Sequence, residues 1–188
     1  LLTERGDWQE DEQLTRLDNG VWEIKLPANA LKQGDKYKLH VYWKDGDGFR
    51  LPSYANYVVQ EENNNFNAVA WKSNYSWQHK TPKFSKDQPL FIYEAHVGMS
   101  SDQPKVSSYR EFANEIIPRI KKAGYNAIQL MALQEHPYYG SFGYHVSNFF
   151  AASSRFGTPD DLKYLIDTAH ENNILVIMDI VHSHAVKN

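Results

Sequence analysis

From Pro89 to the end of the chain, unbroken apolar runs alternate with amphipathic segments. Residues 90–98, 126–133 and 174–181 (LFIYEAHVG, NAIQLMAL and ILVIMDIV) read as strands, and residues 107–125 and 158–173 read as helices. Continuous apolar runs are typical of parallel strands that are buried on both faces. The pattern therefore predicts a βαβαβ unit, with a long loop at residues 134–157 between the second strand and its helix.

Local signals support both predicted helices. In the first, apolar residues at helical spacing share one face (Phe112, Ile116 or Ile117, and Ile120). Gly124 marks the end of this helix, and Pro118 inside it predicts a kink or a tightened turn. In the second, Thr158 can cap the amide of Asp161, with a proline at the first helical position.

The chain before residue 60 has a different pattern, with apolar residues near a period of two. A hairpin is predicted around Asn19–Gly20, and a second one joins residues 36–43 (KYKLHVYW) to residues 49–59 through the turn KDGDG. No clear strand precedes Leu14, and residues 61–89 read as polar and irregular. We expect a partial antiparallel β-sandwich at 1–77, a linker at 78–89 and an α/β domain at 90–188.

Composition excludes several classes of function. With 20 Lys and Arg against 23 Asp and Glu, the formal net charge is -3, which gives no basic field for nucleic acid. No apolar run reaches the length of a membrane span, and the first residues lack a signal peptide's apolar core. The chain has no cysteine, which fits a reducing compartment, so a cytoplasmic location is expected. Because it starts without Met, the chain also looks trimmed.

Polar side chains collect where the predicted strands end, which is where parallel α/β folds place their active sites. The first strand ends on Glu94 and His96. The second ends on residues 134–136 (Gln-Glu-His), and the third delivers Asp179, His182 and His184. The loop at 134–157 is dense in aromatic residues and glycines, and loops of this length are usually functional or disordered.

Three interpretations of the stretch DIVHSH, residues 179–184, remain open from the residues alone. His182 and His184 share a face of an extended strand, so with an aspartate they could bind a divalent metal. Neutral imidazoles could instead donate to and accept from sugar hydroxyls. In the third interpretation, Asp179 is a structural anchor at the end of the strand and a histidine caps the neighbouring loop.

The stretch DIVHSHAVKN resembles the first conserved region of the α-amylase superfamily, glycoside hydrolase family 13, in the form found in glycogen and starch branching enzymes. The similarity runs almost continuously from Leu90 to Asn188 and includes IYEAHVGMSS and LQEHPYYGSFGYHVSNFF. Upstream, LTRLDNGVWEIKLP, HVYWKDG and LPSYANYVVQ are similar to the carbohydrate-binding sandwich (module 48) that precedes the barrel in these enzymes.

The resemblance implies a retaining transfer in glycogen biosynthesis. An α-1,4 bond of a glucan (glycogen, amylose or starch) is cleaved through a covalent glycosyl ester, and the chain is passed to a 6-hydroxyl to form an α-1,6 branch. By the same resemblance, His184 hydrogen-bonds the glucose at the cleaved bond, Tyr144 stacks beneath that ring, and Asp179 orders the site. His136, His145 and His182 are weaker substrate-binding candidates. No metal or other cofactor is implied.

In the family, the nucleophile, the acid and the third carboxylate lie on later barrel strands. The chain is therefore expected to be a fragment that ends after the third strand of a (β/α)8 barrel, with no catalytic residue and no activity alone. A full barrel needs about 250 residues. Asp160 and Asp161 are explained as charges at a helix N-terminus.

Two alternatives to the branching enzyme remain from the sequence. The first is a stand-alone glucan-binding module that uses aromatic residues such as Trp22, Trp43 or Trp71, and the second, a minor one, is a His-x-His metallohydrolase. The open barrel edge also predicts that the isolated chain associates with itself.

Overall fold

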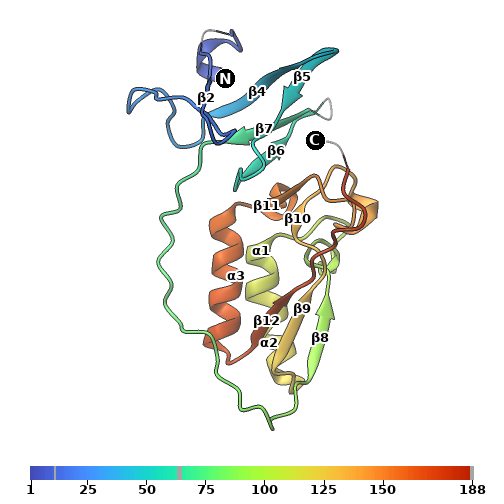
Figure 1. Cartoon of the computed structure of the whole chain (residues 1–188). Coiled ribbons are helices and arrows are strands. Elements are labelled where there is room, and N and C mark those ends of the chain that lie inside the picture. The colour runs from blue at the N-terminus through green and yellow to red at the C-terminus, as the bar shows by residue number, and fades with distance from the viewer. Residues whose placement is uncertain (11, 63–64, 187–188) are drawn as a thin grey trace.

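The computed structural model describes residues 1–10, 12–62 and 65–186, and it shows two parts joined by an extended segment (Figure 1). The first part is a β-sheet region that ends with a strand at Val69. Residues 70–91 contain no helix or strand, and they run beside a long helix of the second part (Figure 1). The second part carries the parallel sheet and its helices.

The N-terminal part contains one five-stranded antiparallel sheet. Its strands are β1 (Leu2–Thr3), β4 (Lys36–Trp43), β5 (Gly46–Arg50), β6 (Val58–Gln60) and β7 (Phe66–Val69). The order is β1-β4-β7-β6, and β5 pairs with the outer half of β4 from Leu39 to Trp43. A 3-10 turn at Glu4–Gly6 follows β1. Val58 and Ala68 are fully buried on this sheet.

Both predicted hairpins are present. The first joins β2 (Thr15–Arg16) to β3 (Trp22–Glu23), with Gly20 at a φ of 81° in the turn. It forms a separate two-stranded sheet. The described residues therefore make a five-stranded sheet and a small hairpin, and the predicted sandwich is not confirmed.

Two expectations for this part were wrong. A strand, β1, does precede Leu14, and β7 lies inside the region expected to be irregular. Strand β7 is only four residues long, and Asn67 in it is buried while its amide donates to Glu61 (3.3 Å). Its pairing with the neighbouring β6 and with the distant β4 supplies the backbone hydrogen bonds. The pairing with β4 is a long-range effect that alternation of residue type cannot reveal.

A cluster of polar side chains around His40 holds the N-terminal segment against β4. One ring nitrogen of His40 contacts Glu10, and the other lies 2.7 Å from Asp47. The hydroxyl of Tyr42 donates to the same Glu10 carboxylate (2.6 Å). A carboxylate only accepts hydrogen bonds, so two flanking carboxylates require His40 to be an imidazolium. The hydrogen bond that His40 donates to Asp47, followed by the one it donates to Glu10, raises the pKa of His40 accordingly.

The second part is built on three parallel strands, β8 (Ile92–Ala95), β9 (Ala127–Leu130) and β12 (Leu175–Met178), in the order β12-β9-β8. Helices cover one face of this sheet (Figure 1). The core lies between the two layers, where the fully buried side chains include Phe112, Ile117, Ile128, Leu130 and Leu165.

The first helical segment is interrupted. It runs through α1 (Tyr109–Glu111), a π-helical turn (Phe112–Ile116) and α2 (Ile117–Lys122). Pro118 was expected to kink or tighten the helix, but the turn before it is widened instead. Proline has no amide hydrogen and its ring clashes with the carbonyl four residues earlier, and the π-turn relieves both conflicts. Gly124 ends the segment at a φ of 87°, as predicted.

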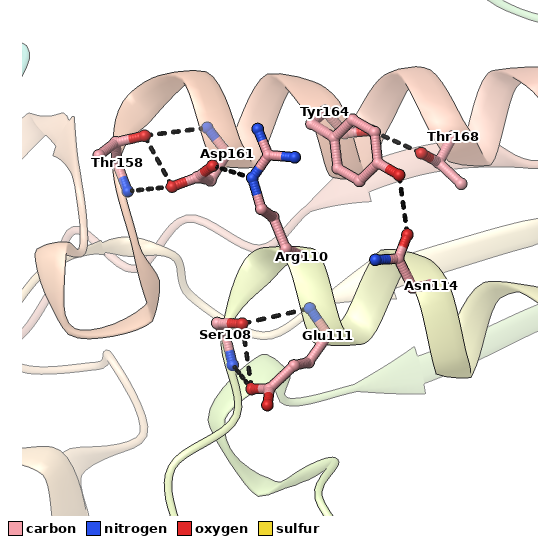
Figure 2. A network of polar contacts seen from close by, with 8 residues as sticks. All are labelled: Ser108, Arg110, Glu111, Asn114, Thr158, Asp161, Tyr164 and Thr168. Carbon is pink, nitrogen blue, oxygen red and sulfur yellow. Dashed lines mark hydrogen bonds and ion pairs between the residues drawn. The ribbon is translucent and has the colours of Figure 1, made fainter.

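The second helix, α3 (Pro159–Glu171), starts as predicted. Thr158 accepts from the amide of Asp161 (3.2 Å), while the Asp161 carboxylate accepts from the amide and the hydroxyl of Thr158 (Figure 2). Ser108 and Glu111 form the same capping box on α1. Arg110 of α1 pairs with Asp161, which ties the two helix starts together (Figure 2).

The predicted long loop contains secondary structure of its own. Strands β10 (Gln134–Glu135) and β11 (Asn148–Ala152) form an antiparallel pair with an irregular register, and 3-10 turns lie at Tyr139–Ser141 and Ser154–Phe156. A further 3-10 turn, Val97–Met99, follows β8. Residues 134–157 are therefore a folded hairpin and not an irregular loop.

This hairpin also contacts the N-terminal sheet. Arg155 donates to the side-chain oxygen of Gln60 (3.0 Å), and Gln60 donates in turn to the carbonyl of Pro137 (3.3 Å). Close by, the rings of Tyr54 and Phe150 lie 4.6 Å apart. The two parts of the chain are thus joined by direct contacts as well as by the connecting segment.

Candidate functional site

The candidate site lies where the parallel strands end. The amide of Asp179, just beyond β12, donates to the carbonyl of Leu130 at the end of β9 (3.0 Å). The hydroxyl of Tyr144 donates to the Asp179 carboxylate (3.1 Å). Tyr144 and Asp179, which were predicted as site residues from separate segments of the sequence, are therefore in direct contact at the expected end of the sheet.

The backbone before Tyr144 fixes the position of its ring. Phe142 and Gly143 both have positive φ values, 55° and 86°. A Cβ atom added at Gly143 would lie 2.0 Å from the carbonyl oxygen of Ala132, so only glycine fits at this point. Burial and then the hydrogen bond to Asp179 raise the pKa of Tyr144, which keeps its hydroxyl protonated as a donor.

Three of the predicted histidines lie at the surface beside this pair. The rings of His145 and His184 are stacked with centroids 6.4 Å apart and an interplanar angle of 17°. His182 packs at 5.4 Å against the ring of Phe149. The amide of Val186 donates to the carbonyl of Val146 (2.9 Å), so the segment after β12 runs against residues 144–149.

His136 occupies a different environment from the other five predicted site residues. It is fully buried, and one of its ring nitrogens lies 2.9 Å from the carbonyl of Gln134. Burial lowers the pKa of His136. The structure therefore brings together Tyr144, Asp179, His145 and His184, with His182 adjacent, and places His136 in the packed interior of the hairpin.

A buried carboxylate supports this hairpin. Glu135 is 1% exposed, and its oxygen atoms accept from the amide and hydroxyl of Ser154 (both 2.7 Å) and from the hydroxyl of Ser153 (3.3 Å). The sequence placed Glu135 at the end of a strand, but it gave no sign of these serine partners. Glu94, by contrast, is exposed and accepts from Gln129 (3.2 Å).

The metal interpretation of His182 and His184 gains no geometric support. Both residues are exposed, and within residues 1–10, 12–62 and 65–186 no group of three His, Asp or Glu side chains is arranged to hold a metal ion. A site that binds a first-row metal needs at least three such ligands from the protein.

Two hollows lie away from Tyr144. One, of about 410 Å³, opens at the edge of β4 and is lined by Trp22, Leu39 and Tyr42 among others. The second, of about 370 Å³, lies between α3, β11 and the connecting segment, where Trp71 and Trp77 contribute. None of the helices described is long and apolar enough to cross a membrane.

Comparisons with known proteins show what this chain is similar to. The family model of the α-amylase catalytic domain matches residues 114–188. The Arabidopsis thaliana protein named 1,4-alpha-glucan-branching enzyme 2-2, chloroplastic/amyloplastic is 47% identical over 199 residues, which cover 100% of this chain. A 1,4-alpha-glucan-branching enzyme from Emericella nidulans is 48% identical over 93% of the chain. This chain is similar over its whole length to branching enzymes of the α-amylase superfamily.

Solved structures show the type of fold that this chain adopts. A pullulanase from Bacillus acidopullulyticus matches 92% of this chain and 25% of its own, with a TM-score of 0.73 and 20% identity. A second pullulanase structure, solved in complex with maltotetraose, matches 89% of this chain and 27% of its own, with a TM-score of 0.72 and 19% identity. The fold is therefore α-amylase-like, consistent with part of a barrel.

The chain spans about a quarter of the length of its curated relatives, 24% of the Arabidopsis protein and 27% of the Emericella protein. The comparisons therefore establish a similarity and a type of fold for these 188 residues. The activity and the roles of single residues need arguments of their own.

Proposed function

We propose that this chain acts in 1,4-α-glucan branching, as the part of the enzyme that binds the donor glucan around the bond to be cleaved. The observation that carries the proposal is the contact between Tyr144 and Asp179 at the carboxyl end of the parallel sheet. It occurs in a chain that is 43–48% identical to proteins named 1,4-alpha-glucan-branching enzyme.

The chemistry assigns distinct tasks to these residues. In a retaining transfer, one carboxylate attacks the anomeric carbon, and a carboxylic acid protonates the leaving oxygen. A sugar 6-hydroxyl then takes the place of water in the second step. Tyr144 supplies an aromatic face for the apolar side of a pyranose ring, and Asp179 holds that ring through its hydroxyl. The attacking carboxylate and the acid belong, by family resemblance, to later barrel strands.

The exposed histidines fit the binding of hydroxyl groups. A neutral imidazole offers one donor and one acceptor, which suits a sugar hydroxyl that does both. His145 and His184 present stacked rings beside Tyr144, and His182 extends the same surface. In this proposal His184 binds the glucose at the cleaved bond, and His145 and His182 line the cleft.

The test is a branching assay on the full-length protein that contains this chain. New α-1,6 bonds in amylose are counted as reducing ends released by a debranching enzyme. We expect Tyr144→Ala to lose most activity and Tyr144→Phe to retain more, because phenylalanine keeps the platform and loses only the hydroxyl. Tyr138→Ala, at a tyrosine that is 64% exposed in the same hairpin, is the matched control. Equal activity of Tyr144→Ala and the wild type would overturn the proposed role.

A second candidate function, a glucan-binding module, rests on the hollow beside β4. Trp22 is 58% exposed and lines that hollow, and Trp43, the last residue of β4, is 48% exposed. Exposed indole rings are suitable platforms for sugar rings. Titration of the 188-residue chain with a maltooligosaccharide separates the two sites. Loss of binding in Trp22→Ala but not in His184→Ala would favour the module.

Three further expectations belong to the same proposal. The domain limits at 1–77, 78–89 and 90–188 and a cytoplasmic location stay predictions, and the name of the Arabidopsis relative points to plastids for that protein. Self-association of the isolated chain is supported by exposed apolar residues just before β8 and beyond β12, among them Phe91 (58%) and Ile180 (50%). A monomer peak in light scattering that does not change with concentration would refute the self-association.

A further inference from the structure

Two buried histidines meet at one phenylalanine beneath the candidate site. His96 begins the 3-10 turn after β8, and His136 follows β10. Their ring centroids lie 5.6 Å and 6.1 Å from that of Phe156. His96 is 9% exposed and His136 is fully buried. The pair thus connects the end of the first parallel strand to the hairpin that carries Tyr144.

The hydrogen bonds of His96 fix its tautomer. The amide of Met99 donates to Nδ1 of His96 (3.2 Å). An amide can only donate, so Nδ1 must carry a lone pair, and the proton of the neutral ring lies on Nε2. This Nε2 is buried and finds no hydrogen-bond partner among the residues that the structure describes. His96 therefore presents an unused donor.

His136 has the opposite arrangement. Its Nδ1 lies 2.9 Å from the carbonyl oxygen of Gln134, which can only accept, so Nδ1 carries the proton. In the neutral ring, Nε2 is then an acceptor. It too is buried and without a partner in the described part of the chain. His136 therefore presents an unused acceptor.

Electrostatics keep both rings neutral. Burial is the largest cause that lowers the pKa of His96, and the neighbouring His136 lowers it further. Burial lowers the pKa of His136 as well, with Glu135 opposing this effect and Arg155 adding to it. Both rings also pack against Phe156. An unused donor and an unused acceptor are therefore held beside the same buried ring inside the protein.

We propose that His96 and His136 are positioning residues that form a tautomer-matched pair. Nε2–H of His96 donates to an enclosed water molecule, and that water donates to Nε2 of His136. A buried polar atom without a partner is costly, and one bridging water satisfies both atoms. The pair fastens residues 134–157 to the end of β8, which supports the hairpin that places Tyr144 against Asp179.

Tight packing around the pair leaves little room for other arrangements. A Cβ atom added at Gly98, in the turn that His96 caps, would lie 2.6 Å from the ring of Phe156 and 3.0 Å from the hydroxyl of Tyr139. The ring of Tyr139 in turn lies 5.8 Å from that of His96. The turn, the two imidazoles and the hairpin therefore form one packed unit, in which an exchange of tautomers would break a hydrogen bond at either ring.

The first test is direct and needs no activity. Long-range proton–nitrogen NMR spectra of the protein labelled with 15N-histidine report which ring nitrogen carries the proton, and His96→Asn and His136→Asn assign the signals by their loss. We expect His96 as the Nε2–H tautomer and His136 as the Nδ1–H tautomer, both neutral at pH 7. The same tautomer at both rings, or an imidazolium at either, would overturn the proposal.

The second test measures the energetic coupling between His96 and His136. Asparagine at 96 keeps an oxygen for the amide of Met99, and asparagine at 136 keeps a donor for the carbonyl of Gln134. Each variant therefore removes the Nε2 function together with the packing of the ring on Phe156. In a double-mutant cycle of denaturant unfolding, the double variant should unfold roughly three- to tenfold less readily than the product of the single effects predicts. Independent, multiplicative effects would contradict the pairing. His96→Asn combined with Glu171→Gln, at an exposed residue of α3, should show no coupling.

Discussion

Asp167 of α3 holds the connecting segment in place, so replacing it by asparagine should release that segment. One carboxylate oxygen accepts from the hydroxyl of Tyr75 (2.6 Å) and from the amide of Gln78 (2.9 Å), and the other accepts from the amide of His79 (2.8 Å). Burial alone would raise the pKa of Asp167, but these hydrogen bonds outweigh it and the pKa is lowered. The carboxylate is therefore ionised, and both of its oxygen atoms accept hydrogen bonds.

The expected loss follows from counting acceptors. Asparagine has one acceptor oxygen, so it can keep the bonds on one side of the carboxylate and must turn its NH₂ group towards the donor on the other. At least one charge-assisted hydrogen bond is lost, each contributing about 1.5–3 kcal/mol. Gln78 and His79 are exposed, so hydrogen bonds to water offset part of this loss in stability. We expect Asp167→Asn to lower the free energy of unfolding by about 2 kcal/mol.

Two assays measure the effect. Denaturant unfolding gives the change in free energy, and limited trypsin digestion reports release of the segment through cleavage after Lys80 and Lys83. Cleavage there should become faster in Asp167→Asn, whereas Glu171→Gln on the same helix should match the wild type. If the free energy of unfolding of Asp167→Asn lies within about 0.5 kcal/mol of the wild-type value and the cleavage pattern is the same, Asp167 does not hold the connecting segment in place.

Three shorter predictions concern other sites. The pKa of His40 is raised in the folded state, so its stabilising effect is full below about pH 6.5, the unfolded value, and is lost as pH rises through the folded value. The difference in denaturation midpoint between wild type and His40→Gln should therefore shrink at alkaline pH. Thr158→Ala removes a capping box and should cost about 1 kcal/mol in denaturant unfolding. Gly143→Ala adds a clash to a positive φ and should cost well over about 1 kcal/mol, more than Gly20→Ala, where nothing lies within 4 Å of the added atom. Equal losses at the two glycines, measured by thermal unfolding, would refute the steric argument.

Features with short-range causes could be predicted from the sequence. The hairpin at Asn19–Gly20 forms because glycine tolerates the positive φ that the turn requires. The start of α3 follows from Thr158 and Asp161, which lie three residues apart and satisfy each other's amides. The three parallel strands follow from their unbroken apolar runs. For the turn and the helix start, the determining interaction lies within a few residues. For the strands, the local signal is the apolar run itself, although the strands pair over long distances in the sequence.

Features that depend on distant partners could not be predicted. Strand β7 pairs with the neighbouring β6 and also with β4, which is remote in sequence. The hairpin at residues 134–157 depends on Glu135, whose partners at Ser153 and Ser154 lie almost twenty residues further on. Asp167 meets residues 75–79 from about ninety positions away. None of these pairings leaves a periodic trace in the sequence.

The candidate site has some features that could be predicted from the sequence and others that depend on how the chain packs. The residue types of Tyr144, Asp179 and His184 were recognisable from family resemblance, and the parallel sheet explains why two distant segments deliver them to one place. The sequence could not separate His145, which is exposed, from His136, which is buried, because both are polar residues of the same hairpin. Burial is decided by how that hairpin packs on Phe156. The same packing that removes His136 from the surface gives it a role in support of the residues that remain there.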